Sequence, residues 1–517
     1  MRVLLCLLTG AVGLSAATCD SLASLALPST AITTAETFPG GLFTPPEGRP
    51  LPNLPSFCRV AGVIKPSSDS DIRFEVWMPS SMWNGRFAGV GNGGFGGSID
   101  FDSLGNLVAA GYVTAATDTG HHGNVTDATW ALGHPEKVTD FGYRAIHETA
   151  EKAKALVAAF YGSGPKRSYF SSCSNGGRQA LMEAQRYPAD YDGIIAGAPA
   201  NYWTSLLSSG VWQQALLQDP AGAIPPAKLP AIEAAALAAC DALDGVQDGV
   251  IDNPPACHFD PSKLLCKGPE NDSCLTASQL TVLQKLYEGP KDAKGRQIFP
   301  GYSPGGQTGV GGWATWITGL RSGRAGGYLF STQFFSQMVF QDAAWDLHTF
   351  NVERDSKTAA DRLGAVLNAA DPDLKRFQER GGKLIIYHGW SDPAISPLST
   401  VDYFESVEKK MGARNTGEFL RLFMVPGMQH CGGGPGPNSF TAPPDPQHDI
   451  RLALEHWVED GVAPHQIVAT KYKGAGPASG IERTRPLCPY PQVAQWKGTG
   501  STDDAANFAC VEPKHAK

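Results

Sequence analysis

Residues 169–178 read Tyr169-Phe170-Ser171-Ser172-Cys173-Ser174-Asn175-Gly176-Gly177-Arg178, and this stretch decides the fold. An apolar strand pattern enters a turn of small residues, and a helix pattern follows it over about 177–186. Small residues two positions before and two positions after Ser174 are typical of a nucleophile elbow. Ser172 stands where the commonest form of that turn has glycine, and an ordinary turn is the alternative interpretation.

Strand and helix patterns alternate on both sides of this turn. We predict strands at 73–78, 87–90, 112–117, 168–171, 193–196, 383–387 and 421–425, with helices at 141–161, 401–411 and 450–459. Asp140 is the expected N-cap of the first helix. The pattern is interrupted between about residues 201 and 370. It therefore predicts an α/β fold with a doubly wound parallel sheet, formed by residues 18–200 and 371–517, and one large insertion, 201–370.

The composition excludes several classes of protein. Of the 517 residues, 42% are hydrophobic and 18% are charged, and the net charge is -8. A disordered chain is excluded, and the chain has no surplus of basic residues with which to bind nucleic acid. No stretch beyond the N-terminus has the roughly 18 apolar residues of a membrane-spanning helix. We expect neither nucleic acid nor a membrane as a partner.

Residues 1–17 have the pattern of a secretory signal peptide: one positive charge, a short apolar run and then small residues. A buried first helix or strand is the alternative. Cleavage would remove Cys6 and leave ten of the eleven cysteines. An even number in an exported protein predicts a disulfide framework, so we expect a secreted or periplasmic protein.

Two later motifs supply partners for Ser174. A serine nucleophile needs a base that is held by an acid. Asp392 follows the predicted strand 383–387, and His430 follows the predicted strand 421–425, which gives the chain order Ser, Asp, His. His388 precedes Asp392, and we expect it to support that loop.

Cysteines flank this candidate nucleophile and base. Cys173 directly precedes Ser174, and Cys431 directly follows His430. If the serine and the histidine meet, the two cysteines come within bridging range. We therefore expect a disulfide between them.

A glycine-rich loop at 91–97 follows the predicted strand 87–90. An oxyanion hole needs two preset backbone N–H donors. We expect one from Asn175, which follows the nucleophile, and the other from Gly93 or Gly94. The spacing and the downstream acid of a dinucleotide-binding loop are absent, so we expect no organic cofactor.

Four aspartates lie between residues 241 and 252. Oxygen ligands at this density suit Ca²⁺, whereas Zn²⁺ would favour His or Cys. The spacing does not fit an EF-hand, and a solvated acidic turn explains the residues equally well.

The motifs Cys-Ser-x-Gly-Gly at 173–177, His-Gly-x-x-Asp at 388–392 and His-Cys at 430–431 resemble those of the tannase and feruloyl esterase family of α/β-hydrolases. The resemblance covers nearly the whole mature chain. It implies an α/β-hydrolase fold, with Ser174 as nucleophile, Asp392 as orienting acid and His430 as base. It also implies that the insertion is a lid that carries most of the acyl pocket.

The resemblance further implies a structural calcium site and a set of disulfides. The ion would fix the lid and take no part in the chemistry. Its ligands would be the side chains of Asp241, Asp244 and Asp248 and the carbonyl groups of Val246 and Val250. Besides Cys173–Cys431, the implied pairs are Cys19–Cys58, Cys240–Cys257, Cys266–Cys274 and Cys488–Cys510, which spacing alone does not fix.

The insertion also holds candidate substrate contacts. We expect most of its aromatic residues to form its core and one or two to stack on a flat aromatic acyl group. Arg321 and Arg324 are candidates to bind a carboxylate or phenolate, although solvent exposure is the commoner fate of such residues. The aromatic candidates are Trp203, Trp212, Trp313, Trp316, Tyr328, Phe330, Phe334, Phe335 and Trp345.

These observations predict a secreted serine esterase of the feruloyl esterase type. It would cleave small aromatic, hydroxycinnamic-type esters through an acyl-enzyme, and plant cell-wall polysaccharide or tannin would carry the ester. Hydrolysis of gallate esters, as by a tannase, and of mono(2-hydroxyethyl) terephthalate are alternatives. The alternative of another class is a non-catalytic protein that binds phenolics or glycans on the same fold.

Overall fold

The computed structural model describes residues 17–320 and 324–513. The predicted signal peptide therefore lies, apart from its last residue, outside the described ranges. Cys6 and Arg321 also lie outside them.

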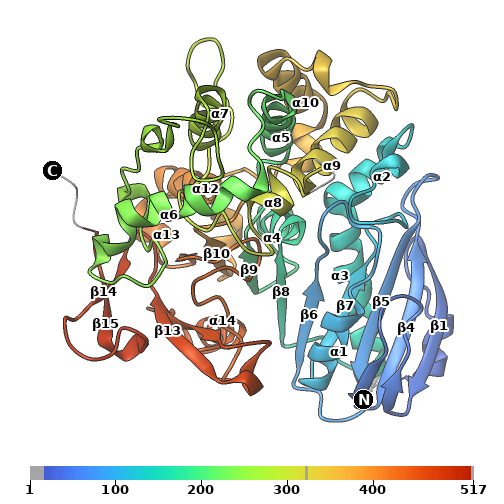
Figure 1. Ribbon diagram of the computed structural model, residues 1–517. Helices are drawn as coiled ribbons and strands as arrows, with labels where there is room; N and C mark the ends of the chain where they lie inside the picture. Colours follow the sequence, from blue (N-terminus) through green and yellow to red (C-terminus); the bar gives the residue numbers. More distant parts are fainter. Residues whose placement is uncertain (1–16, 321–323, 514–517) are drawn as a thin grey trace, which may run out of the picture.

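A nine-stranded sheet forms the centre of the molecule (Figure 1). Every strand predicted from the sequence is present, within two residues of its expected ends. The strand order is β1 (Thr30–Phe38), β4 (Phe57–Ile64), β5 (Ile72–Pro79), β7 (Val113–Thr117), β6 (Arg86–Val90), β8 (Arg167–Cys173), β9 (Gly193–Gly197), β10 (Lys383–Gly389) and β11 (Leu420–Val425). The last six strands in this order run parallel. β5 pairs antiparallel with β7, and β4 and β1 extend that antiparallel edge.

Helices cover both faces of this sheet. Neighbouring side chains on a strand point to opposite faces, so each strand contributes side chains to a core on either face. Phe170 and Ile194 join one core with α3 (Ala145–Tyr161), α4 (Asn175–Arg186) and α12 (Pro397–Met411). Their neighbours Tyr169 and Ile195 join another core with α14 (Ile450–Asp460), beside α1 (Phe101–Ala109). The predicted doubly wound arrangement is confirmed.

The helix expected to begin after Asp140 begins earlier, so the prediction that Asp140 caps it is wrong. α2 (Pro135–Thr139) leads through a π-helical turn, Asp140–Arg144, into α3. Pro135 supplies the first helical position, where a missing N–H is tolerated. Asp140 is buried inside this helix, and Arg144 Nε donates to its carboxylate at 2.5 Å.

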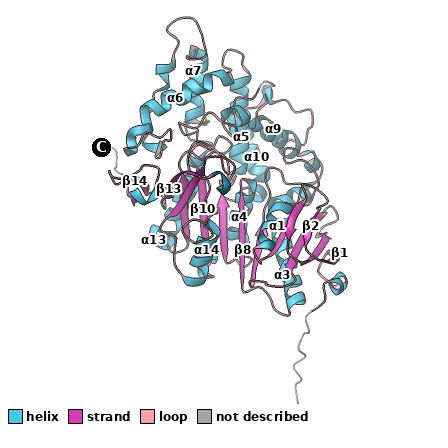
Figure 2. Cartoon of the chain, turned by 60° about the horizontal axis from the view of Figure 1, so that its bottom comes forward, coloured by secondary structure: helices cyan, strands magenta, loops and turns pink. Residues whose placement is uncertain are grey.

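Between β9 and β10 the chain forms a layer of helices at one end of the sheet (Figures 1 and 2). This layer occupies the span where the sequence predicts a lid. One of its hydrophobic clusters includes Phe95 and Ile395 from the loops after β6 and β10, so the layer packs directly on the sheet unit. Its main helices are α5 (Trp203–Gln218), α6 (Leu229–Cys240), α7 (Ala277–Glu288), α8 (Trp313–Trp316), α9 (Gly326–Gln333) and α10 (Val352–Leu367).

Five disulfides join the same pairs that the family resemblance implies. The pairs are Cys19–Cys58, Cys173–Cys431, Cys240–Cys257, Cys266–Cys274 and Cys488–Cys510.

None of the helices in the described ranges is long and apolar enough to span a bilayer.

Candidate active site

Ser174 occupies a strained turn between β8 and α4. Its backbone has φ +67° and ψ -124°, a region that non-glycine residues rarely adopt. The two glycines that follow are sterically required. A Cβ at Gly176 would lie 1.9 Å from Ser172 Oγ, and a Cβ at Gly177 would lie 2.2 Å from the Gly197 carbonyl oxygen. This strained turn presents the Ser174 hydroxyl to a cavity above the strand ends.

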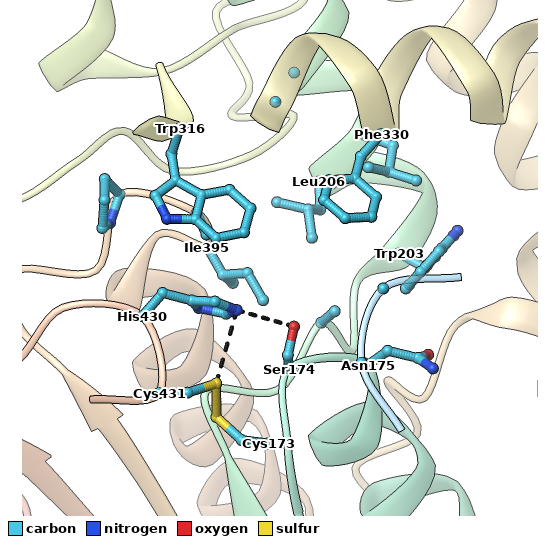
Figure 3. Close-up of a pocket in the computed structure, with 18 of the residues that line it drawn as sticks. Cys173, Ser174, Asn175, Trp203, Leu206, Trp316, Phe330, Ile395, His430 and Cys431 are labelled. Atoms are coloured by element: carbon cyan, nitrogen blue, oxygen red, sulfur yellow. Dashed lines mark hydrogen bonds between the residues drawn. A yellow bond between two sulfur atoms is a disulfide. The ribbon is translucent and has the colours of Figure 1, made fainter. Parts of the chain in front are cut away.

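The loops after β10 and β11 bring Asp392 and His430 to this serine. Figure 3 shows His430 beside Ser174. His430 Nε2 lies 2.9 Å from Ser174 Oγ, and His430 Nδ1 lies 2.7 Å from Asp392 Oδ2. With the proton on Nδ1 directed to the carboxylate, Nε2 is free to accept the serine proton. The three side chains form the hydrogen-bond chain that a serine nucleophile requires.

Asp392 is fully enclosed but well supplied with donors. Burial raises its pKa, but the charges and hydrogen bonds of His430 and His388 outweigh burial and hold the pKa below its ordinary value. The backbone N–H groups of Ala394 and Ile395 also donate to Oδ1, at 2.8 and 3.0 Å. His388 Nε2 lies 3.1 Å from Asp392 Oδ2, and its Nδ1 lies 2.7 Å from Thr400 Oγ1. The carboxylate therefore stays ionised and fixed at neutral pH.

The Cys173–Cys431 disulfide links the serine turn to the histidine loop. Its Cα atoms are 6.0 Å apart, and its half-cystines are separated by 258 residues in the sequence. β9 and β10 lie between β8 and β11 in the sheet, so no backbone ladder joins the two segments directly. The covalent bond supplies the link that the sheet does not.

Two segments with free backbone donors face the cavity beside Ser174. Gly93 and Gly94 line it, and their N–H groups have no acceptor in the described part of the chain. Asn175 begins α4, where the first N–H groups have no intrahelical acceptor. A hydrogen-bond network that the sequence did not reveal joins the segments: Asn92 N–H donates to Gln179 Oε1 at 3.1 Å, and Gln179 Nε2 donates to Asn92 Oδ1 at 2.8 Å.

The cavity has a volume of about 350 Å³ and is mostly apolar. Of the nine aromatic candidates, Trp203, Trp316 and Phe330 line it, and the Trp316 ring meets the His430 ring edge to face at 5.1 Å. Figure 3 shows these aromatic side chains with Leu206 around Ser174. Phe334 and Phe335 belong to the core of the insertion instead. Arg324 is exposed over the Tyr328 ring and does not line the cavity.

Two buried polar side chains that the sequence analysis missed also line the cavity. Tyr302 Oη donates to Gln213 Oε1 at 3.1 Å, and Gln213 Nε2 donates to Ser209 Oγ at 3.0 Å. Gln213 shares one face of α5 with Trp203, Leu206 and Gly210, which also line the cavity. The helical spacing of that face is the only sequence signal that would have indicated Gln213.

The aspartate-rich loop lies away from this cavity and contacts β13 (Ile481–Leu487). Asp241 accepts the N–H groups of Asp248 and Gly249, each at 3.2 Å. Arg483 lies 2.9 Å from the Asp248 carboxylate, and Arg485 contacts the same oxygen. Asp252 is buried beside Asp244, and its Oδ2 has no hydrogen-bond partner among the residues that the structure describes.

A doubly wound sheet with a strained serine turn, a glycine-rich loop after an early strand, and Asp and His on later loops defines the α/β-hydrolase class. Residues 58–511 match the sequence model of the family described as "Tannase and feruloyl esterase", and the chain belongs to this family. It is accordingly a carboxylic ester hydrolase of the feruloyl esterase and tannase type.

Several known proteins are similar over nearly their whole length. An uncharacterized esterase of Xanthomonas campestris pv. campestris is 46% identical, over 96% of this chain and 92% of that protein. The mono(2-hydroxyethyl) terephthalate hydrolase of Piscinibacter sakaiensis is 34% identical, over 89% of this chain and 85% of that protein. The crystal structure of feruloyl esterase B from Aspergillus oryzae superposes with a TM-score of 0.88 at 30% identity, over 95% of this chain and 99% of that one.

The position of the Cys173–Cys431 bridge leads to a prediction. Replacing both cysteines by serine (C173S/C431S) should lower the free energy of unfolding by about 2–5 kcal/mol. It should also lower kcat, because the serine and histidine loops lose their covalent link. C266S/C274S, which opens a bridge of sequence separation 8 in the insertion, is the control and should keep its kcat. Equal kcat values for both double variants, measured well below their Tm, would contradict the prediction.

Proposed function

We propose that the protein hydrolyses esters of aromatic carboxylic acids through an acyl-enzyme on Ser174. The hydrogen-bond chain from Ser174 Oγ through His430 to Asp392, opening into an aromatic cavity, carries this proposal. A protein that only binds phenolics or glycans would not need this chain of hydrogen bonds.

The proposed reaction has two steps. Ser174 Oγ attacks the ester carbonyl carbon while His430 Nε2 takes the hydroxyl proton, and the carbonyl oxygen becomes an oxyanion. The N–H groups of Asn175 and of Gly93 or Gly94 stabilise this oxyanion. The tetrahedral intermediate collapses, and the alcohol leaves with the proton from His430. Water, deprotonated by His430, then attacks the acyl carbonyl carbon. The bond to Ser174 Oγ breaks, His430 returns the proton to Ser174 Oγ, and the aromatic acid is released.

Ser174→Ala tests this mechanism. Loss of the nucleophile should lower kcat by about 10⁴-fold or more without loss of fold. Ser172→Ala is the matched control: Ser172 Oγ packs toward Gly176, so its loss should leave kcat within tenfold. Thermal unfolding and ferulate binding verify that S174A is folded. An active S174A variant would exclude the serine mechanism. A wild type inert on every ester of an aromatic acid would favour the alternative, a non-catalytic protein that binds phenolics or glycans.

We propose hydroxycinnamates as the preferred acyl groups. The related crystal structure is of a feruloyl esterase, and Trp203, Trp316 and Phe330 line the cavity with aromatic rings. Trp203 and Gln213 lie about 15 Å apart along α5, at 1.5 Å per residue. A ring held away from the ester by a propenoyl spacer reaches further toward the Gln213–Tyr302 pair than the ring of a gallate. That pair has unused donor and acceptor capacity for a phenolic hydroxyl.

A terephthalate half-ester fits this cavity less well. Its free carboxylate needs a cation or several donors when it leaves water. No lysine or arginine is among the described residues that line the cavity. The observation favours a neutral hydroxylated ring over an anionic one.

A substrate panel with one variant tests this preference. We expect methyl ferulate and methyl caffeate to react faster than methyl cinnamate, methyl gallate and mono(2-hydroxyethyl) terephthalate. Gln213→Leu should lower kcat/KM for methyl ferulate by about tenfold, which corresponds to one lost hydrogen bond, and leave methyl cinnamate nearly unchanged. Equal losses on both esters would exclude recognition of the hydroxyl, and a fastest rate on methyl gallate would favour a tannase.

We infer that the protein works outside the cytoplasm, on esters carried by plant cell-wall polysaccharide or tannin. Its five disulfides support this inference, because such bonds persist in oxidising compartments.

We also propose a structural calcium ion in the aspartate-rich loop. The density of carboxylates in this loop fits a hard cation, and a cation bound at Asp244 would also offset the negative charge of the buried, unpartnered Asp252 oxygen beside it. Cys240–Cys257 closes the same loop, and Arg483 and Arg485 anchor it to β13. The ion would stabilise the insertion. Its ligands would be the side chains of Asp241, Asp244 and Asp248 and the carbonyls of Val246 and Val250.

Chelation tests this site. Excess EGTA should lower the Tm by several degrees, and added Ca²⁺ should restore it, because an ion that binds only the folded state stabilises that state. Asp244→Asn should have a lower Tm that no longer responds to EGTA, whereas the exposed control Asp260→Asn should respond as the wild type does. A wild-type Tm unchanged by EGTA would count against the site.

A further inference from the structure

Arg178, in the first turn of α4, is a guanidinium buried without an acid. Its side chain is 0% exposed, and no carboxylate contacts it among the described residues. Burial alone lowers its pKa to about 9, so it is still charged at neutral pH. An unpaired buried charge is expensive, and a leucine or methionine of similar size would fill the space at a lower cost in stability.

Neutral acceptors from three parts of the chain surround this guanidinium. Nη1 donates to the Gly142 and Leu367 carbonyls at 2.7 and 3.3 Å, and Nη2 donates to the Phe141 carbonyl at 3.0 Å. Leu367 is the last residue of α10, so one contact reaches the insertion. The guanidinium carbon also lies 4.7 Å from the Phe141 ring centroid and 5.0 Å from that of Trp203, which lines the cavity.

The fourth contact reaches the active site. Arg178 Nε donates to Asn175 Oδ1 at 2.8 Å. Because arginine is only a donor, this bond fixes which end of the Asn175 amide faces it. Asn175 Nδ2 consequently points the other way and donates to the Asn92 carbonyl at 3.2 Å. Asn92 directly precedes Gly93.

This chain of contacts connects the two segments to which we assign the oxyanion donors. One donor is the Asn175 backbone N–H, and the other belongs to Gly93 or Gly94. An oxyanion hole works only when its donors are held at the position of the developing charge before the reaction. The charge of Arg178, which no acid neutralises, also favours negative charge nearby.

We propose that Arg178 is a positioning residue that holds both halves of the oxyanion hole together through the Asn175 amide. The inference rests on the proposed serine mechanism and deepens it. Arg178 contacts no reacting atom, so its effect should appear in the binding of the transition state and not in the binding of the acid product.

Arg178→Lys is the principal variant, because it keeps the charge and loses the planar fork that serves four acceptors. We expect kcat to fall by about 100-fold, as on loss of an oxyanion donor, with KM within threefold of the wild type. Affinity for an arylboronic acid, which forms a tetrahedral adduct with a serine nucleophile, should fall in parallel with kcat. Affinity for ferulate should stay within threefold.

Arg186, at the end of the same helix, provides a matched control. It also donates to a carbonyl of α10, that of Ala365, and lies 4.4 Å from the Tyr143 ring centroid. Arg186 is exposed, unlike Arg178, so Arg186→Lys should lower the Tm less than R178K does, and kcat should stay within twofold of the wild type. An equal fall in kcat for both variants would overturn the proposal, since the effect would then be a general loosening of α4.

Asn175→Ala breaks the same connection from the other end. N175A and R178K should each lower kcat, and the double variant should be no slower than the slower single variant, because both remove one link. Additive losses would overturn the proposal. If R178K does not fold and N175A is fully active, the proposal also fails, because the link would then have no catalytic effect.

These outcomes are distinct from a failure of the serine mechanism. That failure would show as an active S174A variant or as a wild type that binds no arylboronic acid. A wild type that behaves as expected, beside an R178K variant with unchanged kcat and boronate affinity, would exclude only the role of Arg178.

Discussion

The site depends on one hydrogen bond, between Ser174 Oγ and His430 Nε2, whose partners are 256 residues apart in the sequence. The parallel strands make this contact feasible, because their carboxyl ends meet at one edge and their loops project over it. The sheet order still leaves two strands between β8 and β11. The loop after β11 therefore has to carry His430 across to Ser174. The hydrogen bond from His430 to Asp392, which His388 also contacts, and the disulfide between the flanking cysteines hold His430 there.

The inserted helices and the sheet unit form one site rather than a pocket with a separate cover. Trp203 lines the cavity with one part of its side chain and packs on Arg178 with another. Trp316 contacts the His430 imidazole directly. Apolar walls lower the local dielectric, which strengthens each hydrogen bond made to developing charge inside the cavity. In the proposed mechanism, the same residues therefore contribute to substrate selection and to charge stabilisation.

The sequence predicts the central fold well because its strands are buried on both faces and read as short apolar runs. β1 and β4 were missed. The side chains of β1 are mostly half-buried or exposed, and Arg59 and Gly62 interrupt the apolar residues of β4. The serine turn and its partners were predictable from steric demand, chain order and adjacent cysteines. Contacts such as Asn92 with Gln179, Tyr302 with Gln213 and Arg485 with Asp248 were not, because each joins residues far apart in sequence that only tertiary packing brings together. Which of the nine aromatic residues face the cavity depends on the direction of each side chain around its helix, and sequence spacing gives that direction only approximately.

The Cys173–Cys431 bridge determines what a single proteolytic cut does to the chain. It closes a covalent ring that contains the whole inserted layer and, within it, the smaller rings of Cys240–Cys257 and Cys266–Cys274. A protease that cuts once anywhere between residues 174 and 430 opens this ring without releasing either piece. Ser174 and His430 then remain parts of one covalently joined molecule, even when the nicked chain unfolds.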